Sequence, residues 1–178
     1  SPLFELPEVV VTPHLGASTA EAQDRAGTDV AASVRLALAG EFVPDAVNVG
    51  GGVVGEEVAP WLDLVRKLGL LVGALSAELP TNLSVQVRGE LASEEVEVLK
   101  LSALRGLFSA VIEDQVTFVN APSLAAERGV EAAITTAPES PNHRSVVDVR
   151  AVAADGSTVN VAGTLSGPQQ VEKIVQDR

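Results

Sequence analysis

The chain has 178 residues, a formal net charge of −12 and no cysteine. A chain this acidic is repelled by phosphate backbones and by anionic membranes. We therefore expect neither nucleic acid nor a membrane as a partner. The absence of cysteine excludes disulfides, thiolate metal sites and cysteine nucleophiles, and we expect no metal site. No basic segment followed by an apolar one is seen at the start, which favours a cytoplasmic protein.

The first forty residues predict a strand, a loop and a helix. Val9–Val11 is a β-branched run, typical of a strand buried on both faces of a parallel sheet. Ser18 and Glu21 have the spacing of a capping box, so we expect Ser18 to cap a helix that reaches about Ala39 and stops at Gly40. Apolar residues at every fourth position give this helix one packing stripe: Ala22, Ala26, Val30, Val34 and Leu38.

A single strand cannot form a sheet, so we expect the neighbours of this strand to lie outside the chain. The sequence contains no methionine, and we therefore expect that Ser1 is not a natural start and that the chain was processed or cut from something longer. The triple glycine Gly50–Gly52 predicts a hinge. We divide the chain into residues 1–49, the glycine hinge at 50–52, and a second domain of residues 53–178.

The second domain has the pattern of an α+β fold, with helices packed on a mainly antiparallel sheet, so the chain is an α/β fragment followed by an α+β domain. Helices are predicted over three ranges: residues 56–75, 98–112 and 123–128. Strands are predicted over five ranges: residues 83–88, 116–119, 132–136, 146–152 and 158–162. Asp155-Gly156 between the last two strands signals a hairpin. Residues 171–175 form a helix or a strand.

His14 is the first candidate for chemistry. It follows the predicted buried strand and precedes a helix N-terminus, where ligands bind in open α/β sheets. The helix dipole favours an anionic substrate there, and an imidazole exchanges protons with a carbonyl or an alcohol near neutral pH. The alternative is a loop histidine that only hydrogen-bonds the backbone, and position alone favours this alternative.

The segment around His14, residues 12–19, closely resembles the one that surrounds the acid/base histidine of D-2-hydroxyacid dehydrogenases, above all the D-3-phosphoglycerate dehydrogenase family. The resemblance continues through residues 42–48 and then through the second domain, at residues 108–111, 116–122 and 139–145. This domain is similar to the intervening domain of the long, actinobacterial-type form. The resemblance implies that residues 1–49 end the catalytic domain and that residues 53–178 are a regulatory, anion-binding domain.

The resemblance also implies the roles of the first site. His14 would exchange a proton with the 2-position oxygen while a hydride passes between 3-phosphoglycerate and NAD, in L-serine biosynthesis. The backbone from His14 through Leu15, Gly16 and Ala17 would lie beside the nicotinamide, and small residues there let a flat ring come close. The family's catalytic arginine and the glutamate that pairs with the histidine are expected upstream of Ser1. No G-x-G-x-x-G follows a predicted strand, so we expect no turnover by this piece alone.

His143 and Arg144 are the second candidate, because a His-Arg pair in a loop can hold a phosphate or a carboxylate. A solvated loop is the alternative, and sequence alone favours it. The resemblance implies that this domain binds anions, including the substrate, at its junction with a serine-binding regulatory domain expected beyond Arg178. Lys173 matches a family residue of that site, with a plain surface cation as its alternative.

Two functions remain. The chain is part of an enzyme in which His14 is the only catalytic residue that it supplies, or it is a small-molecule-binding module without catalysis of its own. His14 favours the first and the missing nucleotide site favours the second, and both hold if the chain is part of a larger dehydrogenase. The expected partners are 3-phosphoglycerate or other anions, the missing nucleotide-binding and serine-binding domains, and further copies of the chain, because the family forms tetramers.

Overall fold

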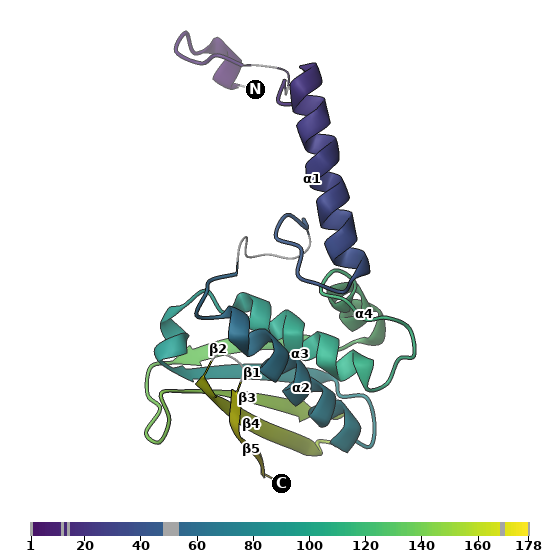
Figure 1. The fold of residues 1–178 in the computed structure, drawn as a ribbon, viewed down its shortest axis with the longest axis vertical. Coiled ribbons are helices and arrows are strands. Elements are labelled where there is room, and N and C mark those ends of the chain that lie inside the picture. The colour runs from purple at the N-terminus through teal and green to yellow at the C-terminus, as the bar shows by residue number, and fades with distance from the viewer. Residues whose placement is uncertain (1, 12, 14, 48–53, 168–169, 178) are drawn as a thin grey trace.

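A sheet covered by helices on one face forms the body of the molecule, and one long helix stands away from it (Figure 1). This computed structural model describes residues 2–11, 13, 15–47, 54–167 and 170–177, with the backbone alone at residues 167 and 170–177. The long helix is α1, Ala20–Leu38, and it follows a short 3-10 helix, η1, at Pro2–Glu5.

The body contains three helices and a five-stranded sheet. Its helices are α2 (Ala59–Leu75), α3 (Glu97–Ser109) and α4 (Ala121–Arg128), with a 3-10 helix η2 at Glu90–Ser93. Its strands are β1 (Asn82–Gly89), β2 (Glu131–Ala137), β3 (Ser145–Val152), β4 (Thr158–Gly167) and β5 (Gln170–Asp177). The strand order is β2-β1-β3-β4-β5.

The predicted α+β class and the mainly antiparallel sheet are confirmed. The pairings β1–β3, β3–β4 and β4–β5 are antiparallel, whereas β1–β2 is parallel. The chain passes through α3 and α4 between β1 and β2, and a crossover of this kind is what a parallel pair requires. The strand over residues 83–88 was therefore placed correctly, but only one of its two neighbours is antiparallel.

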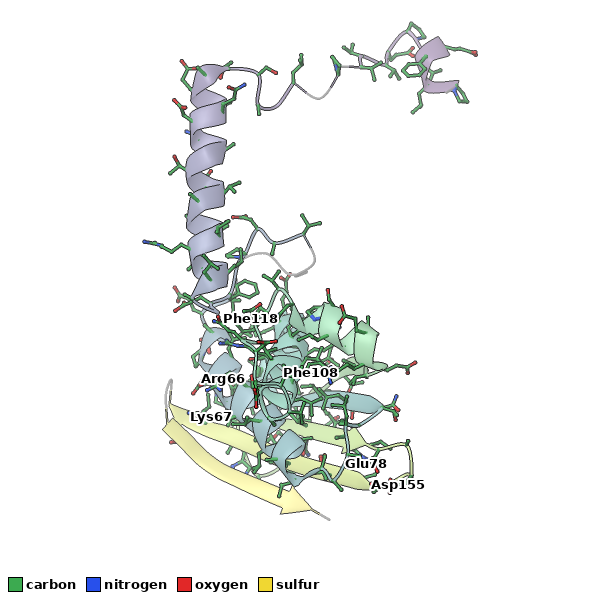
Figure 2. All side chains as sticks on the ribbon, turned by 90° about the vertical axis from the view of Figure 1, so that its right-hand side faces the viewer. Arg66, Lys67, Glu78, Phe108, Phe118 and Asp155 are labelled. Atoms are coloured by element: carbon green, nitrogen blue, oxygen red, sulfur yellow. The ribbon has the colours of Figure 1, made fainter. Side chains whose placement is uncertain are left out.

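The core lies between the sheet and the helices α2 and α3. Side chains alternate along β1, so that Leu83, Val85 and Val87 are buried on the side of the helices. The helix predicted over residues 56–75 is confirmed as α2, and one face of it is buried: Trp61, Leu64, Val65, Leu68 and Val72. Phe108 of α3 is fully buried at the centre (Figure 2). The two helices approach so closely that a Cβ on Gly106 would overlap the carbonyl oxygen of Arg66.

The strand predicted over Val9–Val11 is wrong. This segment is loop, and the side chains of Val10 and Val11 are 88% and 62% exposed. A strand needs a hydrogen-bonding neighbour, and none of the five strands in the described part of the chain lies beside these residues. The β-branched run therefore has no sheet to join.

The helix predicted after this segment is confirmed, with its cap shifted by one residue. The side chain of Thr19 accepts the backbone N–H of Ala22 at 3.2 Å. The hydroxyl of Ser18 instead donates to the carbonyl oxygen of Leu15 at 2.8 Å. α1 has no buried residue, so the predicted stripe has nothing to pack against.

The strand predicted over residues 116–119 is also wrong. The Asn120 side chain accepts the backbone N–H of Thr117 at 2.7 Å and folds the segment into a turn. Val116 and Phe118 are buried as core residues of a loop. The hairpin at Asp155-Gly156 is confirmed, and residues 171–175 belong to strand β5.

The predicted hinge at residues 50–52 lies outside the described residues, so the division into residues 1–49 and 53–178 stays a prediction. Among the helices that the structure describes, none is both long enough and apolar enough to cross a bilayer.

Candidate functional site

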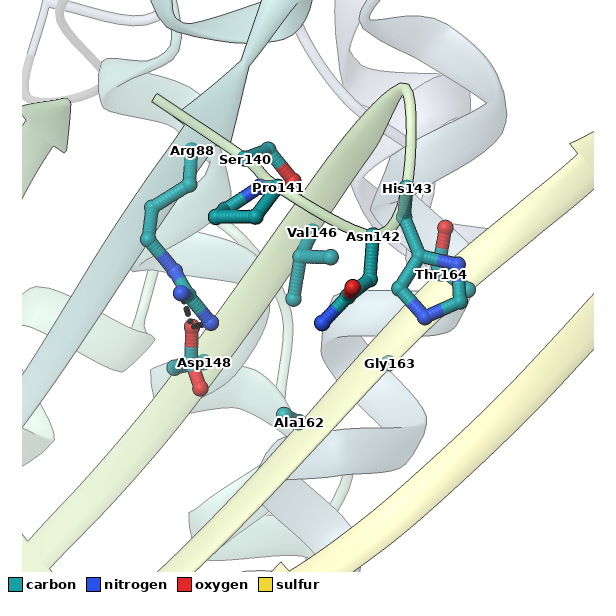
Figure 3. Close-up of a pocket in the computed structure, with 10 residues that line it drawn as sticks. All are labelled: Arg88, Ser140, Pro141, Asn142, His143, Val146, Asp148, Ala162, Gly163 and Thr164. Carbon is teal, nitrogen blue, oxygen red and sulfur yellow. Dashed lines mark hydrogen bonds and ion pairs between the residues drawn. The ribbon is translucent and has the colours of Figure 1, made fainter. Parts of the chain in front are cut away.

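A cavity of about 210 Å³ opens on the face of the sheet opposite the helices (Figure 3). Outward-facing positions of β1, β3 and β4 make its floor, and the loop before β3 makes its rim. The floor residues include Arg88, Val146, Asp148, Ala162 and Thr164, and the rim is residues 140–143. The buried residues of β1 alternate with these positions, so one strand serves both the core and the cavity.

An ion pair on adjacent strands lies at one side of the cavity. Nε and Nη2 of Arg88 both donate to Oδ2 of Asp148, at 3.0 and 2.8 Å. Asp148 is paired in register with Gln86, so the contact is a diagonal one across β1 and β3. The two side chains are 33% and 18% exposed. The pair holds the guanidinium at the cavity wall and offsets part of its charge.

The rim supplies polar side chains that are not yet engaged. Within the described part of the chain, the side chains of Ser140, Asn142 and His143 make no hydrogen bond or ion pair. All three can donate to a ligand, and Figure 3 shows Asn142 and His143 across the cavity from Arg88. The cavity therefore combines one guanidinium with three free polar side chains.

The structure separates the predicted His143–Arg144 pair. His143 lines the cavity, whereas Nε of Arg144 donates to Oε2 of Glu90 at 2.6 Å. This hydrogen bond raises the pKa of Arg144. Both partners are largely exposed, and water screens exposed ion pairs of this kind, so the pair adds little to the stability of the fold. Arg144 is therefore a surface residue of the loop and does not line the cavity.

Lys173 lies on strand β5, in register with Thr164 of the cavity floor. Its side chain lies outside the described part of the structure, so its predicted role in anion binding is untested. Within the described residues, no group of three or more His, Asp or Glu side chains is arranged to hold a metal ion.

Comparison with known proteins assigns the fold. Residues 57–176 match the model of the D-3-phosphoglycerate dehydrogenase intervening domain. The chain belongs to this family. Proteins named D-3-phosphoglycerate dehydrogenase from Mycobacterium leprae and Mycobacterium tuberculosis are 85% identical to it over 99% of its length. One from Synechocystis is 41% identical over 73% of the chain. The chain spans only 33% of the length of the mycobacterial relatives.

The loop before α1 carries the other predicted site. His14 lies outside the described residues, so its catalytic role is untested. Leu15 is 59% exposed, and Gly16 and Ala17 form a turn. A Cβ on Gly16 would meet nothing within 4 Å. The position of Leu15, Gly16 and Ala17 beside a nicotinamide therefore stays a prediction.

One glycine pattern needs a structural test. Gly50, Gly52 and Gly55 match the letters G-x-G-x-x-G. In a dinucleotide-binding fold, a strand leads straight into this pattern and a helix opens at it. Here residues 41–47 are loop and turn, and α2 begins only at Ala59. The described flanks of this pattern therefore lack the strand and the adjoining helix that a pyrophosphate site requires, while Gly50 and Gly52 lie outside the described residues.

Arg88 and Asp148 were not predicted as site residues. Both occupy outward-facing positions of strands that the sequence placed correctly. They are separated by 60 positions in sequence, and alternation along a strand does not reveal which strand lies next to it, so the sequence does not show the contact.

Proposed function

We propose that the chain is part of a D-3-phosphoglycerate dehydrogenase, which transfers a hydride between 3-phosphoglycerate and NAD in L-serine biosynthesis in the cytoplasm. The observation that carries the proposal is 85% identity, over 99% of this chain, to mycobacterial proteins of that name. These relatives are about three times as long. We assign the nucleotide-binding and serine-binding domains to the remaining length, and a tetramer to the assembled enzyme.

His14 is the residue to which we assign proton exchange with the substrate's 2-position oxygen, with Leu15, Gly16 and Ala17 beside the nicotinamide. The cavity of the intervening domain offers groups that can bind a small ligand. We therefore give it a second role within the same enzyme.

We propose that the intervening domain binds a small anion, such as 3-phosphoglycerate or phosphate, in the cavity beside His143. A guanidinium and several free donors around one cavity are suited to a carboxylate or a phosphate. Asp148 faces the same cavity and already takes two hydrogen bonds from Arg88, so the site is less positive than its arginine suggests. Lys173, on the strand beside the floor, is proposed as a further cation of this site.

An activity assay tests the first proposal. The full-length dehydrogenase that carries this sequence should reduce NAD with 3-phosphoglycerate, and His14→Ala should lower kcat by at least about 100-fold, because it removes the acid/base group. Arg150→Ala is the control, since Arg150 is exposed on β3 and far from residues 12–19 in sequence. Full activity in His14→Ala would contradict the assignment.

Calorimetric titration of the 178-residue chain with 3-phosphoglycerate tests the second proposal. His143→Ala should weaken binding by about tenfold, because one hydrogen bond to a charged group is worth about 1.5 kcal/mol or more. Arg144→Ala is the matched control: it removes a cation one residue away, from a side chain that does not line the cavity. Equal losses in the two variants would mean that the anion binds to the loop surface.

A further inference from the structure

The C-terminal end of α1 packs on the intervening domain, although the rest of the helix is exposed. The N–H of Glu41 donates to the carbonyl oxygen of Leu36 at 2.9 Å, and the N–H of Gly40 donates to the carbonyl oxygen of Ala37 at 3.0 Å. This is a Schellman motif, which needs a left-handed residue, and Gly40 has φ 73°. Gly40 is also buried, in contrast to every residue of α1 itself.

The surface that receives this end comes from α3 and the loop after it. A Cβ on Gly40 would lie 3.1 Å from Nη2 of Arg105 and 3.1 Å from Nε2 of Gln115. Nε2 of Gln115 also donates to the carbonyl oxygen of Leu38 at 3.4 Å. The last turn of a helix leaves its carbonyls without helical partners, so this bond ties the end of α1 to the domain.

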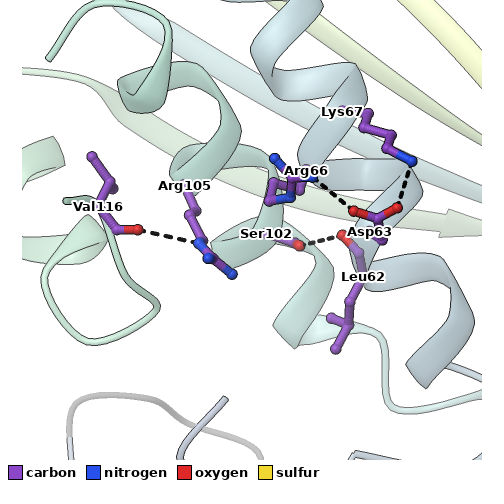
Figure 4. Close-up of polar contacts among 7 residues, drawn as sticks. All are labelled: Leu62, Asp63, Arg66, Lys67, Ser102, Arg105 and Val116. Atoms are coloured by element: carbon purple, nitrogen blue, oxygen red, sulfur yellow. Dashed lines mark hydrogen bonds and ion pairs between the residues drawn. The ribbon is translucent and has the colours of Figure 1, made fainter. Parts of the chain in front are cut away.

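The next residues continue the contact. The rings of Phe42 and Phe118 meet edge to face, with centroids 5.6 Å apart. The guanidinium of Arg105 lies 5.1 Å from the centre of the Phe118 ring, and its Nε donates to the carbonyl oxygen of Val116 at 3.1 Å (Figure 4). Val43 is 4% exposed. Burial is the main cause that lowers the pKa of Arg105, and the nearby charge of Arg66 lowers it further.

We infer that Arg105, Gln115 and Phe118 form a latch that fixes the end of α1 on the intervening domain and thereby orients the loop before α1. The inference rests on the proposed function, because it takes that loop, with His14, as catalytic. α1 has 19 residues and is about 28 Å long, so a tilt of about 10° at the latch moves its far end by about 5 Å. The three latch residues are positioning residues, which act on the catalytic loop through α1.

Hydrogen exchange in the 178-residue chain tests the latch itself. Arg105→Ala removes the stacked guanidinium and should raise the exchange of residues 36–46 by about tenfold, while β3 and β4 keep their protection. Arg150→Ala, at an exposed site on β3, is the matched control. Unchanged exchange of residues 36–46 in Arg105→Ala overturns the latch.

Gly40→Ala approaches the latch from its other side. It places a Cβ against Arg105 and Gln115 at a positive φ, and should also raise the exchange of residues 36–46 by about tenfold. Gly156→Ala separates crowding from backbone strain, since Gly156 has φ 84° with no atom within 4 Å of its Cβ position. An effect of Gly40→Ala confined to residues 38–41, without the Phe42 segment, overturns the latch.

Kinetics of the full-length dehydrogenase test the positioning role. Arg105→Ala should lower kcat by about tenfold, because misplaced reacting groups slow the chemical step, and should leave KM within about twofold. Faster exchange with an unchanged kcat overturns the positioning role. If the wild-type enzyme shows no dehydrogenase activity, the proposed function fails, and the exchange experiments still decide whether the latch exists.

Discussion

Helices α1 and α2 both carry an apolar stripe, but only the stripe of α2 is buried. Leu64 and Leu68 of α2 are 1% and 0% exposed, whereas Val30, Val34 and Leu38 of α1 are 61%, 50% and 74% exposed. The periodicity of a helix shows which face it offers, and the rest of the fold decides whether anything covers that face. Within the described residues, nothing covers the stripe of α1.

The largest difference between the two regions should appear in a pair of phenylalanine substitutions. Phe108 is 0% exposed in the core, so Phe108→Ala should lower the free energy of unfolding by about 3–5 kcal/mol. Phe4, near the N-terminus, is 69% exposed, and Phe4→Ala should change it by less than about 0.5 kcal/mol. Urea denaturation followed by Trp61 fluorescence measures both, and similar losses would mean that residues 2–11 share the core.

A pair of glycine substitutions makes the same comparison at the level of helix packing. A Cβ on Gly106 would overlap the carbonyl oxygen of Arg66, so Gly106→Ala must push α2 and α3 apart, at a cost of about 1–3 kcal/mol. Gly27 lies in α1 with open space around it, and Gly27→Ala should leave the main thermal transition unchanged while it raises the helicity of α1. A neutral Gly106→Ala would contradict the close packing of the two helices.

A smaller effect is expected on the open face of the sheet. Asp148→Asn removes the charge that faces Arg88, and should lower the free energy of unfolding by about 1 kcal/mol, because the pair is only half-buried. Arg144→Gln breaks the far more exposed pair with Glu90 and should lower the free energy of unfolding by less than Asp148→Asn does. The reverse order would mean that the loop pair, and not the strand pair, stabilises the cavity.

The smallest effect concerns pH. The hydrogen bond from Lys67 is the main cause that lowers the pKa of Asp63 below 3.8, with a further bond from Arg66, and burial opposes both (Figure 4). Because the pKa of Asp63 is lower in the folded state, its carboxylate stabilises the fold above about pH 4. This stabilisation is lost as the pH falls through the pKa that Asp63 has in the folded state. Asp63 is 59% exposed, so the change should stay below about 1 kcal/mol. Lys67→Met should flatten the dependence of urea stability on pH between 5 and 2.

Local patterns predicted most of the body of the fold. The alternation in β1, the stripe of α2 and the Asp155-Gly156 turn each depend on neighbours in sequence, and the elements lie where expected. Val9–Val11 has an equally clear local pattern and is not a strand. A strand is completed by hydrogen bonds to another strand, so its local pattern is necessary and not sufficient.

The candidate site was predicted only in part for the same reason. His143 was identified as part of a His-Arg pair in a loop, but its neighbour Arg144 binds Glu90 and does not line the cavity. Arg88 reaches the cavity through the pairing of β1 with β3 and the register of that pairing. The latch around Arg105 depends on the docking of residues 40–43 on α3, which no periodicity reveals.

Hydrogen exchange of the unmodified chain tests the comparison most directly. Most of the stability of a protein helix comes from tertiary packing, which residues 20–34 lack within the described chain. The amides of residues 20–34 should therefore exchange at least about 100-fold faster than those of β3 and β4. The amides of residues 36–43, at the latch, should exchange more slowly than those of residues 20–34 and faster than those of β3 and β4. Protection of residues 20–34 equal to that of the β3–β4 hairpin would contradict the account, because it would show that the stripe of α1 is covered.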